Sequence, residues 1–172
     1  MAVAQAAGVD FYWLATGLEQ NIHMSLAELQ HVIDDRENTW IPRYDIGLSA
    51  GHGSFIERAE RLDAVPFTNI FFSKRLNRSP DGMVIVDARG DSMEPTIADR
   101  DQVMIDTTDT RLVPAIWAFA MDEAVMVKRL NQTPQGIEIV SDNAIYGRQL
   151  IGPGQADHFS LIGRVVWVGR VL

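Results

Sequence analysis

The sequence predicts a mostly β domain preceded by short helices. From Tyr44 onward, short β-branched or alternating apolar runs are separated by turn residues, a pattern typical of β-rich domains. Before that point, apolar residues occur in short pieces that glycine ends, as in helices. With 172 residues, of which 47% are hydrophobic, the chain is large enough for one globular domain with an appendage.

The N-terminal segment is expected to be helical but too short to form a core. Residues 2–17, AVAQAAGVDFYWLATG, predict short helical pieces that end at Gly17. The capping box that runs from Ser25 to Glu28 predicts a helix of about three turns. We therefore assign residues 19–43 to a linker with a short helix, and place the start of the main domain, residues 44–172, after the charged run at 34–38.

The main domain is expected to contain seven strands. Turn residues at 79–82, 133–136 and 152–154 separate several of them. The segment 54–62 mixes charged and apolar residues and predicts no defined element. The predicted strands are 44–48, 83–88, 102–106, 115–120, 123–129, 136–140 and 160–171.

Composition excludes several classes of function. The formal charge is −8, and the first 35 residues contain no lysine or arginine, so a broad cationic surface for nucleic acid is excluded. The absence of cysteine excludes disulfides and a cysteine nucleophile, and the four histidines lack the spacing of metal ligands. We expect no metal and no cofactor. No apolar run is long enough to cross a bilayer, which predicts a cytoplasmic protein without a membrane partner.

One turn carries a candidate nucleophile. Gly90, Asp91 and Ser92 lie between two strongly predicted strands, so the serine hydroxyl can be accessible while neighbouring backbone N–H groups point to a common oxyanion position. Serine alone is a poor nucleophile and needs a base.

The candidate base is Lys128, one of two lysines in the sequence beside Lys74. It stands in the apolar strand segment EAVMVKRL, where burial would lower its pKa and let a neutral amine take the serine proton. The alternative is that Lys128 points to solvent from an edge strand and that residues 90–96 form an ordinary turn. The presence of both features in one chain favours catalysis.

Together these segments resemble a known family. GDSMEPTIADRDQVMID and the lysine of VMVKRL are similar to the peptidase domain of LexA, UmuD and the lambdoid-type phage repressors, which cut themselves with a Ser-Lys dyad. IEIVSDNAIY and FSLIGRVVWVGRVL resemble later strands of that domain, so the resemblance covers about residues 44–172. It implies a mostly β, LexA-like fold that forms a homodimer. It also implies Ser92 as nucleophile, Lys128 as base, and the N–H groups of Asp91 and Ser92 as oxyanion donors.

The family's substrate is a loop of its own chain, cut at an Ala-Gly or Cys-Gly bond. Ala50-Gly51, upstream of the serine in IGLSAGHGSF, is the corresponding candidate. The alternative is a flexible loop without a cut, since His52 and Gly53 make this segment richer in glycine than that of LexA.

Residues 1–18 resemble the truncated end of a phage-repressor helix-turn-helix domain through VAQAAGVDFYWLATG. The helices that would enter the major groove are missing, so operator DNA would be bound only by helices outside this sequence. The resemblance also implies an activated RecA filament as the trigger of cleavage.

Three other functions compete with a self-cleaving regulator. Type I signal peptidases also pair a serine turn with a lysine, although no membrane-spanning segment is present. A dimerisation or sensing module with a vestigial dyad would have the same sequence features. A stand-alone DNA-binding protein is disfavoured by the acidic charge.

Overall fold

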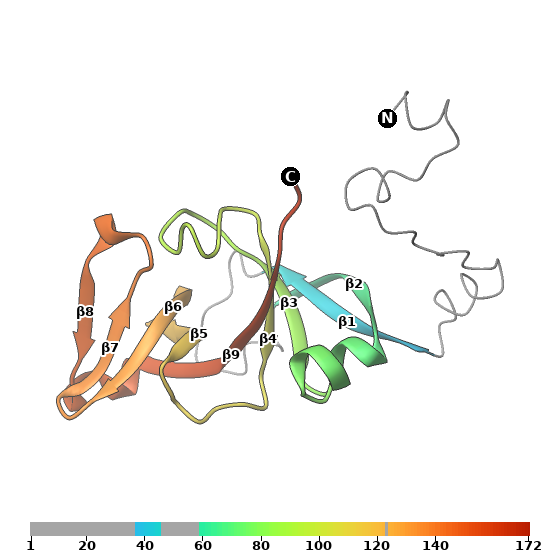
Figure 1. The fold of residues 1–172 in the computed structure, drawn as a ribbon. Coiled ribbons are helices and arrows are strands. Elements are labelled where there is room, and N and C mark those ends of the chain that lie inside the picture. The colour runs from blue at the N-terminus through green and yellow to red at the C-terminus, as the bar shows by residue number, and fades with distance from the viewer. Residues whose placement is uncertain (1–36, 46–58, 123) are drawn as a thin grey trace, which may run out of the picture. The chain divides into compact units, whose positions relative to one another are not determined.

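Nine strands form one sheet in the computed structural model, which describes residues 37–45, 59–122 and 124–172. Residues Asn38–Leu172 make up one compact unit, and the strand order is β2-β1-β3-β4-β9-β5-β6-β7-β8 (Figure 1). The prediction of a mostly β domain is confirmed. The helices predicted before residue 37 lie outside the described residues.

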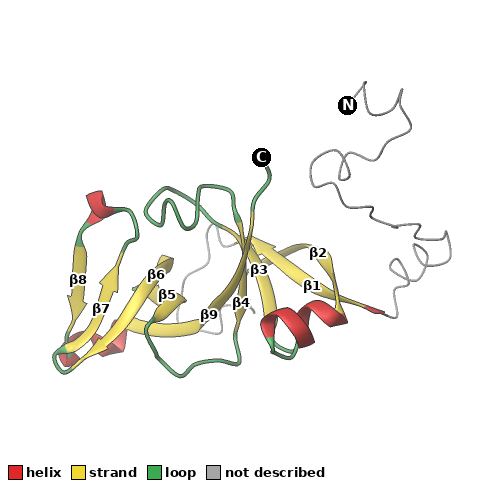
Figure 2. Cartoon of the chain, in the orientation of Figure 1, coloured by secondary structure: helices red, strands yellow, loops and turns green. Residues whose placement is uncertain are grey.

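Short helical segments accompany the strands (Figure 2). They are η2 (Phe71–Leu76), η3 (Ala144–Tyr146) and η4 (Pro153–His158). The strands are β1 (Asn38–Asp45), β2 (Glu60–Thr68), β3 (Met83–Asp87), β4 (Gln102–Asp106), β5 (Ala115–Met121), β6 (Ala124–Thr133), β7 (Gly136–Val140), β8 (Arg148–Ile151) and β9 (Phe159–Gly169).

Six of the predicted strands agree with the structure, two of them, β4 and β7, at both ends. The strand predicted at 44–48 is wrong in its bounds, because β1 runs from Asn38 to Asp45. The charged run and Pro42 indicated a break there, yet Ile41 is buried and pairs with Val65 of β2.

Two strands escaped prediction, and both lie at edges of the sheet. β2 contains Pro66 and several charged residues, which an edge strand tolerates because one side of its backbone needs no ladder partner. β8 has only four residues and follows Gly147, so it offers no alternation to detect.

β3 and β4 form the centre of the core. Along each strand, alternate side chains point into two different hydrophobic clusters, called cluster 1 and cluster 2. Val84 and Val103 belong to cluster 1, which also holds Ala118 of β5. Met83 and Met104 belong to cluster 2. The near-continuous burial of MVIVD therefore reflects a strand that is covered on both faces.

β9 joins the two halves of the sheet, pairing with β4 and with β5. Each ladder has a register shift, and such bulges increase bending and twist. Gly163 permits the close approach, since a Cβ atom there would lie 2.4 Å from the carbonyl oxygen of Asp106. β9 thus allows Ala118 of β5 to share cluster 1 with β3 and β4.

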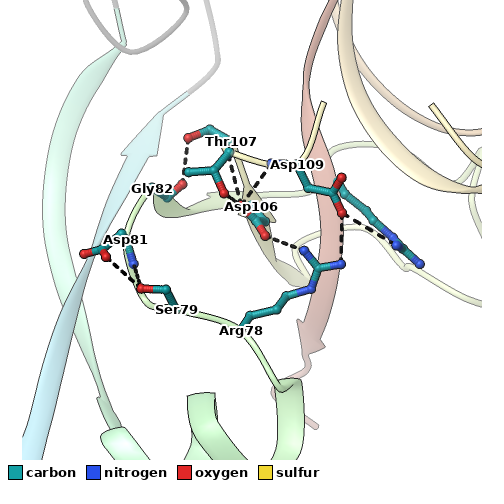
Figure 3. A network of polar contacts seen from close by, with 9 residues as sticks. Arg78, Ser79, Asp81, Gly82, Asp106, Thr107 and Asp109 are labelled. Carbon is teal, nitrogen blue, oxygen red and sulfur yellow. Dashed lines mark hydrogen bonds and ion pairs between the residues drawn. The ribbon is translucent and has the colours of Figure 1, made fainter. Parts of the chain in front are cut away.

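A network of ion pairs closes the end of β4 (Figure 3). Arg78 donates hydrogen bonds to Asp106 and Asp109, the latter at 3.0 Å. Thr108 donates to Asp106 through both its N–H and its hydroxyl, at 3.0 and 2.6 Å. Arg164 of β9 lies 3.6 Å from Asp109. The network fixes the β4–β5 connection against β9 and the segment after η2.

No helix in the described part of the chain is long and apolar enough to span a membrane.

Candidate active site

Ser92 lies in the connection between β3 and β4, which internal hydrogen bonds hold in shape. The N–H of Ala88 donates to the carbonyl of Asp101 at 2.7 Å, and the N–H of Arg100 donates back to Ala88 at 2.9 Å. Met93 and Ile97 are 4% and 2% exposed within cluster 1. Full burial of such side chains contributes about 1.5–3 kcal/mol each. The turn is therefore anchored on both sides of a half-buried Ser92.

The carbonyl groups beside Ser92 are engaged. The carbonyl of Asp91 accepts hydrogen bonds from the Glu94 N–H at 3.0 Å and from the Asn143 side chain at 3.1 Å. The carbonyl of Ser92 accepts from the Asn143 N–H at 3.1 Å. Within the described residues, the N–H groups of Asp91 and Ser92 donate no hydrogen bond, so both are available to a ligand.

Lys128 lies in β6, an interior strand between β5 and β7. It pairs with the fully buried Trp117, and Met126 and Leu130 lie on the same face of the strand. Burial among these apolar groups lowers the pKa of the Lys128 amine, and the nearby Asp91 carboxylate opposes this shift. The alternative placed Lys128 on an edge strand, which is wrong because β6 is an interior strand, and the lysine is half-buried.

The fold brings the serine turn and the lysine strand to the same place. Met93, next to Ser92, lies in cluster 1, and Val127, next to Lys128, packs against that cluster. Asp91 acts electrostatically on Lys128. The serine turn and the strand that carries Lys128 thus pack on the same core, and Asp91 of the turn is close enough to act on the lysine amine.

A second link joins the serine turn to β6 through Asp142. The Thr96 hydroxyl donates to Asp142 at 2.6 Å, while Arg129 donates to both carboxylate oxygens, at 2.9 and 2.8 Å. The hydrogen bonds from Arg129 lower the pKa of Asp142, against the effect of its burial. Because Arg129 follows Lys128 directly, this link fixes the strand that carries the lysine against the turn.

Sequence reasoning missed the side chains of the segment after β7. Tyr146 donates a short hydrogen bond to the Asp91 carboxylate, and Lys128 Nζ lies 5.7 Å from the centre of its ring. Asn143 caps η3 and bonds the serine turn. An asparagine directly after a strand is a local signal for a turn or cap and could have indicated Asn143, whereas no local signal indicates Tyr146.

Ala50-Gly51 lies outside the described residues, and the structure places only the strands that flank it. The bond stands between the end of β1 and the start of β2. β1 pairs in parallel with β3, where Tyr44 lies opposite Val86. At the end of β1, Asp45 accepts a hydrogen bond from Arg89 at 2.6 Å.

The described residues contain no group of three or more histidine, aspartate or glutamate side chains that could hold a metal ion.

Comparison with known proteins identifies the family of this chain. An HTH-type transcriptional regulator of Haemophilus influenzae is 28% identical over 185 residues, a match that covers 99% of this chain and 77% of the regulator. The 26 kDa repressor protein of Escherichia phage HK022 is 30% identical over 129 residues, covering 71% of this chain and 54% of the repressor. The model of the Peptidase S24-like family matches residues 44–166, and the chain therefore belongs to that family.

Proposed function

We propose that this chain is part of a phage-repressor-like transcriptional regulator that inactivates itself by cutting its own Ala50-Gly51 bond. The observation that carries the proposal is the half-buried Lys128, whose lowered pKa suits a general base, held beside the serine turn in a member of the Peptidase S24-like family. The two relatives are a transcriptional regulator and a repressor by name, which supports the regulatory role.

In the proposed reaction, the neutral amine of Lys128 takes the proton of the Ser92 hydroxyl as its oxygen attacks the Ala50 carbonyl carbon. The oxyanion accepts hydrogen bonds from the N–H groups of Asp91 and Ser92. The C–N bond then breaks, and the Gly51 amine leaves with the proton from Lys128. Water then attacks the carbonyl carbon of the resulting ester and gives a proton to Lys128. The bond from that carbon to the Ser92 oxygen breaks as Lys128 returns the proton to the serine, which restores both residues and leaves Ala50 with a carboxyl group.

Chain length supports a cut within the same molecule. Ala50 lies five residues beyond Asp45, a span of roughly 17 Å when extended. Asp45 is bonded to Arg89, and Ser92 is three residues further on, roughly 10 Å. The loop can therefore approach Ser92 while the sheet stays intact. A substrate held in the same chain makes the first step unimolecular.

The proposed consequence is loss of repression. We propose that residues 44–172 form a homodimer that holds two operator-binding heads, supplied by helices outside this sequence. A bivalent dimer gains affinity because the second head binds at high effective concentration. Cleavage before that domain would remove this gain without altering any contact with DNA. An activated RecA filament is the proposed trigger.

The test is to incubate the purified chain at increasing pH, with and without RecA filament and nucleotide, and to weigh the products by mass spectrometry. We expect two fragments, 1–50 and 51–172, formed at a rate that is independent of protein concentration and rises with pH. Lys74→Met is the matched control, because Lys74 is the other lysine of the chain and is exposed.

Ser92→Ala and Lys128→Met should each slow cleavage by about 10³-fold or more. Persistent cutting in Ser92→Ala overturns the assignment of the nucleophile. An intact wild-type chain under all conditions overturns self-cleavage and favours a dimerisation module with a vestigial dyad. Sedimentation of the Ser92→Ala variant tests the dimer, and a monomer at all concentrations contradicts it.

A further inference from the structure

We propose that Tyr146 is a positioning residue for the dyad, whose hydroxyl holds the Asp91 carboxylate away from Lys128 and so keeps the lysine amine available as a base. This inference rests on the proposed function, because it assigns a residue that controls the base of the same reaction.

The geometry joins three side chains from different parts of the chain. Asp91 lies in the serine turn, Lys128 in β6, and Tyr146 at the end of η3. The Tyr146 hydroxyl donates to Asp91 Oδ1, while the face of its ring lies 5.7 Å from Lys128 Nζ. Tyr146 therefore contacts both the carboxylate and the amine.

Asp91 is close enough to act on Lys128 electrostatically, yet within the described residues no ion pair of 4.0 Å or less joins the two. A carboxylate beside a lysine favours the ammonium, which cannot act as a base. The hydrogen bond to Tyr146 directs this carboxylate to a neutral partner. The same bond raises the pKa of the Tyr146 phenol, so the hydroxyl keeps its proton and remains a donor.

Other charged groups near the cluster have their own partners. Arg129, next to Lys128 in β6, is bonded to Asp142. Glu94, in the serine turn, acts on Tyr146 but is not among the groups that shift Lys128. On β5, the residue opposite Lys128 is Trp117, which carries no charge. Asp91 is thus the charged group that acts on the Lys128 amine, and Tyr146 is the residue bonded to its carboxylate.

The backbone holds the segment that carries Tyr146 in place. Asn143 bonds the carbonyls of both Asp91 and Ser92, and its side chain accepts from the N–H of Ile145. The Tyr146 N–H donates to the Asn143 carbonyl at 3.1 Å. Tyr146 is half exposed, at 52%, so removal of its hydroxyl leaves the core unchanged.

Substitutions of Tyr146 and Asp91, the two residues of the hydrogen bond, should shift the pKa of Lys128 in opposite directions. In Tyr146→Phe, the released carboxylate can turn to Lys128 and favour the ammonium, so the lysine should titrate at a higher pH. In Asp91→Asn, the negative charge is removed while the shape is kept, so the lysine should titrate at a lower pH. If Tyr146 has no such role, Tyr146→Phe should leave the Lys128 midpoint at its wild-type value, while Asp91→Asn still lowers it.

The experiment uses lysine labelled with ¹³C at Cε, in the full chain carrying Ser92→Ala so that no cleavage occurs. The sequence has two lysines, so the spectrum holds two signals, which Lys74→Arg assigns. We expect the Lys128 titration midpoint to rise in Tyr146→Phe and to fall in Asp91→Asn. In the double variant of Tyr146→Phe and Asp91→Asn, the Lys128 midpoint should equal that of Asp91→Asn alone. The signal of the exposed Lys74 serves as the internal reference in all variants.

Cleavage in chains with Ser92 intact provides the second readout. Below the wild-type midpoint, Tyr146→Phe should cut about threefold or more slowly, and Asp91→Asn at least as fast as wild type, because the cleavage rate follows the fraction of Lys128 that is neutral. A Lys128 midpoint that does not rise in Tyr146→Phe overturns the role of Tyr146. Opposite movements in a wild-type chain that never cuts overturn the proposed function but not the electrostatic arrangement.

Discussion

Arg78 and Lys128 are both cations beside aspartates, but the fold treats them differently. Burial alone would lower the pKa of Arg78, and its hydrogen bonds to Asp109 and Asp106 raise it instead. Burial lowers the pKa of Lys128, and the electrostatic attraction of Asp91 does not offset it. The aspartates of the first cluster face the cation (Figure 3), whereas the carboxylate of the second is bonded to Tyr146.

The difference separates a structural cluster from a chemical one. A cation bonded to two carboxylates keeps its charge at every physiological pH and can only hold elements together. The Lys128 amine is partly buried, and the Asp91 carboxylate that acts on it is bonded to Tyr146. Its pKa is therefore lowered, which is what the proposed role as a base requires. A substitution in the Arg78 cluster should therefore lower stability without changing cleavage, and one at Lys128 should do the reverse.

The largest effect on stability is expected at Asp106. Asp106→Ala removes a carboxylate that is only 5% exposed and that pairs with Arg78. The free energy of unfolding should therefore fall by about 3 kcal/mol. Urea unfolding in the Ser92→Ala background measures this change. Asp81→Ala is the control, since Asp81 is exposed and, among the described residues, bonds only Ser79. The substitution should lower the free energy of unfolding by less than about 1 kcal/mol.

Cleavage by the folded fraction of Asp106→Ala should equal that of wild type within about threefold. A loss of cleavage as large as that in Lys128→Met would instead show that the two clusters are coupled.

The stabilising effect of Asp106 should depend on pH. Burial would raise the pKa of Asp106, but hydrogen bonds from Thr108 and Arg78 outweigh it and lower the pKa. A carboxyl group with a lowered folded pKa contributes stability that is present above its unfolded value, about 3.9, and is lost as the pH falls through the folded pKa. Unfolding curves of wild type and Asp106→Asn should therefore converge in acid. Curves that stay parallel would contradict this assignment.

A smaller effect is expected at Asp142, which links the serine turn to β6. Asp142→Asn weakens the bonds from Arg129 while a side chain of the same shape still accepts from Thr96. We expect cleavage to slow by roughly tenfold, because a misplaced base costs that much, and stability to fall by about 1–2 kcal/mol. Glu138→Gln, in an ion pair on β7, is the control. Unchanged cleavage in Asp142→Asn would show a purely structural link.

The sequence allowed prediction of most strands that lie inside the sheet, although β1 was wrong in its bounds. MVIVD and QVMID are apolar because both faces are covered, and such runs are easily identified. Ser92 and Lys128 were assigned because a serine turn and a lysine in an apolar strand occur together in one chain, and the dyad stays a prediction. β2 could not be predicted, since Pro66 and its charges are tolerated only at an edge, and the position of a strand in a sheet is a tertiary property.

The third partner of the site could not be predicted for a related reason. Tyr146 contacts Lys128 and Asp91 only because η3 follows β7, which pairs with β6. No local pattern encodes such a contact between distant segments. The Ala50-Gly51 assignment stays a prediction, because these residues lie outside the described part of the chain.

The smallest effect separates the two cations most directly. Lys128→Met in the Ser92→Ala background removes an amine that the apolar face of β6 disfavours when charged, so the free energy of unfolding should rise by up to about 1 kcal/mol at neutral pH. The folded pKa of Lys128 is lowered, so between the folded and unfolded pKa values the unfolded chain binds more protons and wild-type stability rises with pH.

The advantage of Lys128→Met should therefore shrink as the pH approaches the unfolded value of about 10.4. Lys74→Met, at an exposed position, should show neither the gain nor the pH dependence, and urea unfolding from neutral to alkaline pH compares the three proteins. If Lys128→Met instead destabilises the fold as Asp106→Ala does, Lys128 is a structural cation of the same kind as Arg78. A gain that fades with rising pH would show that the fold carries a cost for holding this lysine, as expected of a residue kept for its chemistry.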